Sequence, residues 1–304
     1  MPAIIVTTQN GQRHLRPTET DLADLVRRLG DASDQWLVVQ RVPDLPAVFI
    51  QVAHATGETY TLEYRDGTPG LRFEASLDAP DQVIAAMIGW ARADDGWNDG
   101  ITWSRVEFAT DPVPPLDLDD EKRNRLEERV REWLVCGYVT RQELAERTEE
   151  YFVSGGRKLV SADQARQLAD RLWVERVQEQ AAWSGETDPD RISRAFEELD
   201  TSGITAREDF TCCRTCGNSE IGDEGGPGAR GFVYFHSQGT EAAADGHGLS
   251  LMYGGFDGSP ETTAAVGREV VKVLEEAGLP VVWNGDPGQA ITITPLDWRK
   301  RLIG

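Results

Sequence analysis

Three neighbouring runs near the N-terminus have the pattern of β-strands, at residues 47–54, 59–64 and 71–77, and in the last two hydrophobic and polar residues alternate. In the second run Tyr60, Leu62 and Tyr64 alternate with polar residues, which is typical of strands with one buried face. Turn residues separate the runs, among them Asp66-Gly67. Two further β-rich runs lie at residues 4–8 and 36–41. The pattern therefore predicts an antiparallel meander.

Two segments of the same region repeat apolar residues at helical spacing. The first carries Leu22, Leu25, Val26 and Leu29 and is followed by Gly30. The second carries Val83, Ile84, Met87, Ile88 and Ala91, and Asp78 is placed to cap it ahead of Pro80. A last strand is expected over residues 101–108. We therefore predict an α+β domain over residues 1–110, in which a mostly antiparallel sheet carries two helices on one face.

Closely spaced prolines predict a linker over residues 111–119. A second domain is expected over residues 120–304, and it begins with helices. Two of these helices start at capping boxes, Thr140 with Glu143 and Ser161 with Gln164. After Gly203 the pattern changes, and we expect strands over 204–209, 231–238 and 249–256, a helix from Ser259 and a hairpin over 280–294. The predicted fold class is α+β with two domains, the second a helical segment followed by a small sheet unit.

The composition of the chain limits the classes of partner that it is expected to bind. The chain has 304 residues, which fits two domains, and 52 acidic against 31 basic residues give a net charge of −21. This charge opposes binding to nucleic acid or to an anionic membrane and suits a basic protein partner. The N-terminus lacks the basic region and cleavage site of a signal peptide, and we expect a cytoplasmic protein.

Three of the four cysteines lie within residues 212–216. Cys213-x-x-Cys216 has zinc-ligand spacing, and a tetrahedral site needs two more ligands. His236 and His247 are the candidates, with Asp223 or Glu224 as substitutes, and we expect Cys212 to point away from Cys213. The predicted metal site is therefore Cys213, Cys216, His236 and His247, with zinc as the expected ion.

Two other interpretations of the motif stay open. A cysteine at a helix N-terminus has a lowered pKa, so Cys213 is a candidate nucleophile or redox partner of Cys216, with Thr211 as helix cap and His236 as base. Alternatively, Cys212, Cys213 and Cys216 are small buried hydrophobic residues that pack beneath the sheet.

The C-terminal part also carries a family resemblance. The residues that carry it form four segments: TDPDRISRA at 187–195, DFTCCRTCGNSEI at 209–221, GFVYFH at 231–236 and MYGGF at 252–256. With its TCCxTCG motif, this C-terminal three-fifths of the chain resembles an uncharacterised bacterial domain-of-unknown-function family. Residues 1–110 are more loosely similar to small α+β domains of bacterial immunity-type proteins. Neither resemblance implies a catalytic residue.

The leading interpretation of the sequence is a non-enzymatic binding or interaction protein of an immunity or regulatory type. It depends on the acidity, on the lack of a catalytic motif in the sequence and on the meander domain. The rival is a metal- or thiol-dependent enzyme, or a zinc-stabilised domain, that is centred on the cluster at 212–216 with His236.

Overall fold

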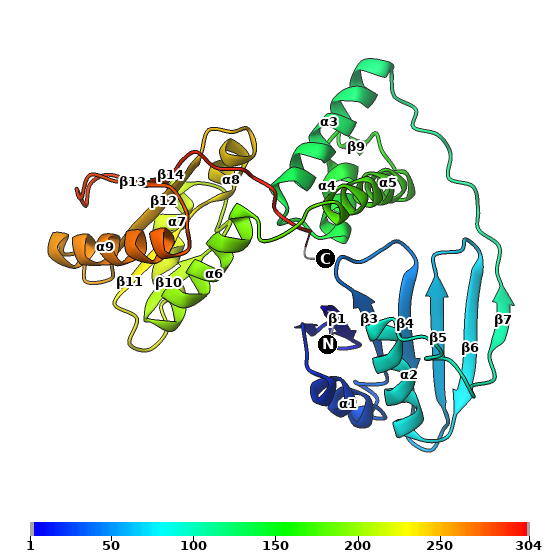
Figure 1. Ribbon diagram of the computed structural model, residues 1–304. Helices are drawn as coiled ribbons and strands as arrows, with labels where there is room; N and C mark the ends of the chain where they lie inside the picture. Colours follow the sequence, from blue (N-terminus) through cyan, green and yellow to red (C-terminus); the bar gives the residue numbers. More distant parts are fainter. Residues whose placement is uncertain (1–2, 303–304) are drawn as a thin grey trace. The chain divides into compact units, whose positions relative to one another are not determined.

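The computed structural model describes residues 3–302, and its fold class is α+β, as predicted (Figure 1). Contacts divide these residues into two compact units. Unit 1 combines residues 3–123 with Thr140–Val177, and unit 2 combines Asn124–Val139 with Gln178–Leu302. The units are not consecutive in sequence, whereas the predicted domains are, because residues 140–177 pack with the N-terminal sheet.

Unit 1 contains a 7-stranded antiparallel sheet of order β2-β1-β3-β4-β5-β6-β7. The strands are β1 (Ile4–Thr8), β2 (Arg13–Leu15), β3 (Trp36–Arg41), β4 (Val48–Ala53), β5 (Tyr60–Asp66), β6 (Leu71–Leu77) and β7 (Ser104–Glu107). The predicted meander is therefore confirmed. Strand β2 was not predicted, because it has only three residues, and β7 is shorter than the run expected over 101–108.

Helices α1 (Glu19–Arg28) and α2 (Pro80–Arg92) cover one face of this sheet, as predicted (Figure 1). Leu22 and Met87 of their apolar stripes are fully buried with Ile50 and Leu62 of the strands. The expected cap at Asp78 is wrong. Ala79 is the N-cap of α2, and its methyl side chain cannot accept a capping hydrogen bond; Pro80 follows in the first turn, where its missing N–H costs nothing.

Helix α4 (Arg141–Glu150) and most of helix α5 (Ala162–Ala181) complete unit 1. Both predicted capping boxes are confirmed: Thr140 and Glu143 exchange hydrogen bonds, and so do Ser161 and Gln164. A short hairpin that was not predicted, β8 (Val153–Ser154) and β9 (Arg157–Lys158), joins the two helices.

Unit 2 contains a 5-stranded sheet of order β10-β11-β12-β14-β13, in which only the β10–β11 pair is parallel. The strands are β10 (Ile204–Arg207), β11 (Gly231–Tyr234), β12 (Leu249–Gly255), β13 (Val281–Val282) and β14 (Ile291–Ile293). The helices are α3 (Asp120–Cys136, whose first turn lies in unit 1), α6 (Asp188–Thr201), α7 (Arg214–Glu220), α8 (Ser237–Ala244) and α9 (Pro260–Glu276), and a short 3₁₀ helix, η1, spans Ile221–Glu224.

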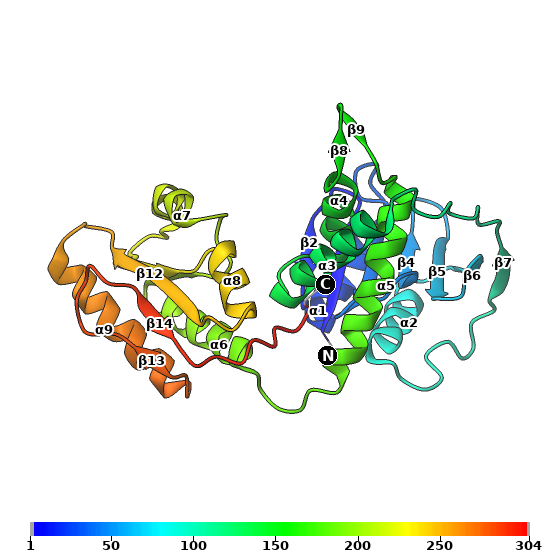
Figure 2. The ribbon, with the colours of Figure 1, turned by 90° about the horizontal axis from the view of Figure 1, so that it is seen from above.

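Helices α7 and α9 lie on opposite faces of the unit 2 sheet (Figure 2). Along β11, Gly231 faces Val266 of α9, whereas Tyr234, three residues on, faces Gly217 of α7. The predicted strand over 231–238 is too long, because Ser237 begins α8. No helix within residues 3–302 is long and apolar enough to cross a membrane.

Candidate metal centre

The cysteine motif lies in the loop that follows β10 and in the first turn of α7. Two backbone hydrogen bonds attach this loop to the chain after β11. The N–H of Phe210 donates to the carbonyl of Phe235 (2.8 Å), and the N–H of Ser237 donates to the carbonyl of Thr211 (3.1 Å). The hydroxyl of Ser237 also donates to the carbonyl of Cys212 (3.2 Å). The backbone that carries the cysteines is therefore held by neighbouring elements.

The sulfur atoms of Cys212, Cys213 and Cys216 lie within 4.8 Å of one another. Those of Cys212 and Cys216 are 3.5 Å apart. A zinc–thiolate bond of about 2.3 Å separates neighbouring sulfurs of a tetrahedral site by about 3.8 Å. Cys212 is exposed, and the other two are partly buried. The arrangement therefore fits three thiolates around one ion, with a side open to solvent.

A glycine lets α7 approach the sheet behind the cysteines. A Cβ atom at Gly217 would lie 2.5 Å from Cε2 of Tyr234, so no larger residue fits without movement. The hydroxyl of Tyr234 donates to Oδ1 of Asn218 (2.6 Å). Because Cys216 directly precedes Gly217, this packing holds the backbone that carries Cys216 against the sheet. The sequence interpretation missed Gly217, although a glycine inside a predicted helix beside a ligand is a detectable signal.

The thiols of Cys213 and Cys216 differ in acidity. The nearby backbone N–H of Cys216 lowers the pKa of the Cys213 thiol, and the Cys212 side chain acts in the same direction. The Cys212 and Cys213 side chains raise the pKa of Cys216 to about 11. A bound metal ion competes with these protons, since only thiolates coordinate it. Cys213 is therefore more easily deprotonated than Cys216 for a first metal–sulfur bond.

The fourth cysteine, Cys136, provides an internal comparison. It is the last residue of α3 and does not belong to the three-sulfur cluster. Burial raises the pKa of its thiol to about 12, with a smaller contribution from Glu241. Cys136 is therefore expected to be unreactive under conditions in which the cluster reacts.

The structure brings together only part of the predicted metal site. Cys213 and Cys216 are adjacent, but their third neighbour is Cys212, which we expected to point away. Neither predicted histidine belongs to the cluster. His236 is the N-cap of α8 and accepts a hydrogen bond at Nδ1 from the N–H of Gly239 (3.1 Å), and burial lowers its pKa. His247 is exposed in the turn before β12.

The remaining residues that the sequence suggested around the cysteines do not have the predicted roles. Glu224 is ion-paired with Arg207 (2.8 Å), and Asp223 is exposed beside it, so neither joins the sulfurs. Thr211 does not cap α7, because Cys213 occupies the N-cap position. The interpretation of the cysteines as buried hydrophobic residues is wrong, because Cys212 is exposed and its two neighbours are only partly buried.

Comparison with known proteins gives one match. Residues 119–302 match a protein family described as "Domain of unknown function (DUF6891)". No curated protein and no solved structure matches the chain. The matched segment contains the whole cysteine motif and agrees with the resemblance of the C-terminal three-fifths. The immunity-type resemblance of residues 1–110 stays a prediction.

Proposed function

The chain belongs to the DUF6891 family, a domain of unknown function, and we propose that its cysteine cluster binds one thiophilic metal ion, with zinc as the first candidate. The observation that carries this proposal is the placement of three sulfur atoms within 4.8 Å of one another. Such ions prefer thiolate ligands, and Cys212, Cys213 and Cys216 supply three of them.

The open side of the cluster determines the kind of site that we propose. Structural zinc sites are closed by four protein ligands, whereas sites that exchange a ligand keep one position for water or another molecule. The exposed Cys212 completes a set of three, and no histidine or carboxylate of the described chain joins that set. The protein would therefore hold its ion accessible to a fourth ligand from solution or from a partner.

We place this function in the cytoplasm, as the sequence predicts, because thiols stay reduced there. We also retain the proposal that the protein binds rather than catalyses, and that a macromolecular partner would be basic. The net charge of −21 supports a basic partner. Recovery of no basic protein in a pull-down with the products of neighbouring genes would contradict it.

Zinc is expected to shield the three clustered thiols from alkylation. The full chain would be treated with iodoacetamide at neutral pH with and without one equivalent of zinc, and each cysteine would be followed by mass spectrometry. Without zinc, Cys213 should react before Cys216, because the pKa of Cys213 is lowered and that of Cys216 is raised. With zinc, Cys212, Cys213 and Cys216 should all be protected, while Cys136 stays unreactive in both samples. Equal labelling of the cluster with and without zinc would contradict the proposal.

Thiol–disulfide exchange is the second candidate, and the 3.5 Å separation of the Cys212 and Cys216 sulfurs favours it. Incubation with oxidised glutathione, together with the zinc-protection experiment, distinguishes the two functions. An exchange site would yield a Cys212–Cys216 or Cys213–Cys216 disulfide on incubation with oxidised glutathione and would gain no protection from zinc. A metal site requires that zinc protect the clustered thiols from alkylation.

A further inference from the structure

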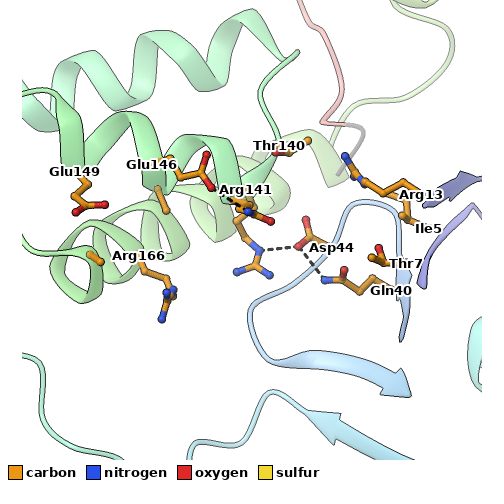
Figure 3. Close-up of a pocket in the computed structure, with 13 residues that line it drawn as sticks. Ile5, Thr7, Arg13, Gln40, Asp44, Thr140, Arg141, Glu146, Glu149 and Arg166 are labelled. Carbon is orange, nitrogen blue, oxygen red and sulfur yellow. Dashed lines mark hydrogen bonds and ion pairs between the residues drawn. The ribbon is translucent and has the colours of Figure 1, made fainter. Parts of the chain in front are cut away.

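Unit 1 contains a cavity of about 540 Å³ that is unrelated to the cysteines (Figure 3). Its walls come from strands β1 and β3, from the loop after β3 and from helices α4 and α5. Its lining includes the polar side chains of Gln40, Asp44, Arg141, Glu146 and Arg166. The family match begins at residue 119, so the cavity combines family residues with the N-terminal sheet. Its volume suits a small metabolite.

One wall of this cavity is rigid. Arg141 donates from Nε to Asp44 (2.7 Å) and from Nη1 to Asp170 (2.7 Å). Asp44 also accepts from Gln40 (3.3 Å), and its backbone carbonyl accepts from the indole of the fully buried Trp173 (2.7 Å). Partners on both sides therefore fix the Arg141 guanidinium. Its Nη2 makes no hydrogen bond with a described residue, so this nitrogen is available to a ligand.

Arg166 and Glu146 also line the cavity and are not part of this framework. Arg166 has only a 3.5 Å contact with Asp163, and both side chains are more than 60% exposed. Glu146 accepts a hydrogen bond from Gln142 (2.9 Å) and forms no ion pair with any described residue. Figure 3 shows Arg141 and Glu146 on α4 and Arg166 on the neighbouring helix α5, with the side chains of the two arginines extending in the same direction. The cavity thus presents donors for a carboxylate and a separate acceptor for a cation.

We propose that this cavity binds a small zwitterion of the free α-amino acid class. The carboxylate of the ligand would accept from Arg141 Nη2 and from Arg166, and its ammonium group would donate to Glu146. A simple anion or a simple cation would each leave one charge of the lining uncompensated, so a ligand with both charges should bind more tightly than either. This site does not depend on the metal function of the cysteine cluster.

Calorimetric titration of the full chain with the 20 common L-amino acids tests the proposal. The best amino acid is compared with its N-acetyl derivative, which lacks the ammonium group, and with its amide, which lacks the carboxylate. The amino acid should bind at least about 10-fold more tightly than either derivative, as expected for the loss of one charge-assisted contact. Arg166→Ala and Glu146→Gln should each weaken it by a similar factor.

Arg27→Ala is the matched control, because Arg27 is an exposed arginine of α1 that does not line the cavity. It should leave binding unchanged, and melting curves of all variants without ligand should coincide. The proposal is overturned if no amino acid binds at millimolar concentration. It is also overturned if the N-acetyl derivative or the amide binds as tightly as the amino acid, or if Arg166→Ala and Arg27→Ala bind the ligand equally well.

Discussion

Replacing Cys213 with serine is expected to lower the affinity of the protein for zinc by at least about 100-fold. A serine hydroxyl keeps its proton near neutral pH and is a poor ligand for a soft ion, so two thiolates would remain of three. Cys213 is the first choice for replacement, because its pKa is lowered whereas that of Cys216 is raised. A competition titration with a chromogenic chelator measures the affinity directly.

Cys136→Ser controls for the loss of a thiol as such. Cys136 lies outside the cluster, and burial keeps it protonated. The Cys136→Ser variant should bind zinc as tightly as the original chain. Cys212→Ser and Cys216→Ser, like Cys213→Ser, should each lower the affinity for zinc. An unchanged affinity for Cys212→Ser would show that the third sulfur plays no part, and that a histidine or an external ligand replaces it.

Replacing Gly217 with alanine is expected to lower the free energy of unfolding by about 2 kcal/mol, a typical cost of overpacking. The added methyl group would lie 2.5 Å from the ring of Tyr234, and α7 must move to relieve the overlap. Since α7 carries Cys216, zinc affinity should fall in the same variant. Chemical denaturation and the chelator titration measure the two effects separately.

Tyr234→Leu in the Gly217→Ala background removes the ring that the methyl group meets, so the two changes should be less than additive. Gly222→Ala is the control, because a Cβ atom there meets no described atom within 4 Å and its backbone is not left-handed. The packing argument would be contradicted if the losses in the free energy of unfolding for Gly217→Ala and Tyr234→Leu were additive. It would also be contradicted if Gly222→Ala lowered the free energy of unfolding as much as Gly217→Ala.

Local patterns predicted the elements well. Strands β3 and β6 begin and end at the predicted residues, and the capping boxes at Thr140 and Ser161 are present, because each depends on residues that are near in sequence. The short spacing between Cys213 and Cys216 likewise predicted their proximity. Backbone geometry within one loop and one helical turn is enough to bring them together.

Long-range partners could not be predicted in this way. His236 looked like a metal ligand at the end of a strand, but the chain turns there into α8 and the imidazole caps the helix. The packing of residues 140–177 with the N-terminal sheet depends on contacts such as Trp173 with Asp44, which are 129 positions apart. No sequence periodicity encodes such a contact, so the cavity beside Arg141 was not foreseen either.

X-ray absorption spectroscopy of the full chain loaded with one equivalent of zinc tests the central claim most directly. We predict three sulfur neighbours at about 2.3 Å and one lighter neighbour, oxygen or nitrogen, in the first coordination shell. A first shell of only oxygen and nitrogen, or zinc that washes out during buffer exchange, would contradict a metal centre built from Cys212, Cys213 and Cys216.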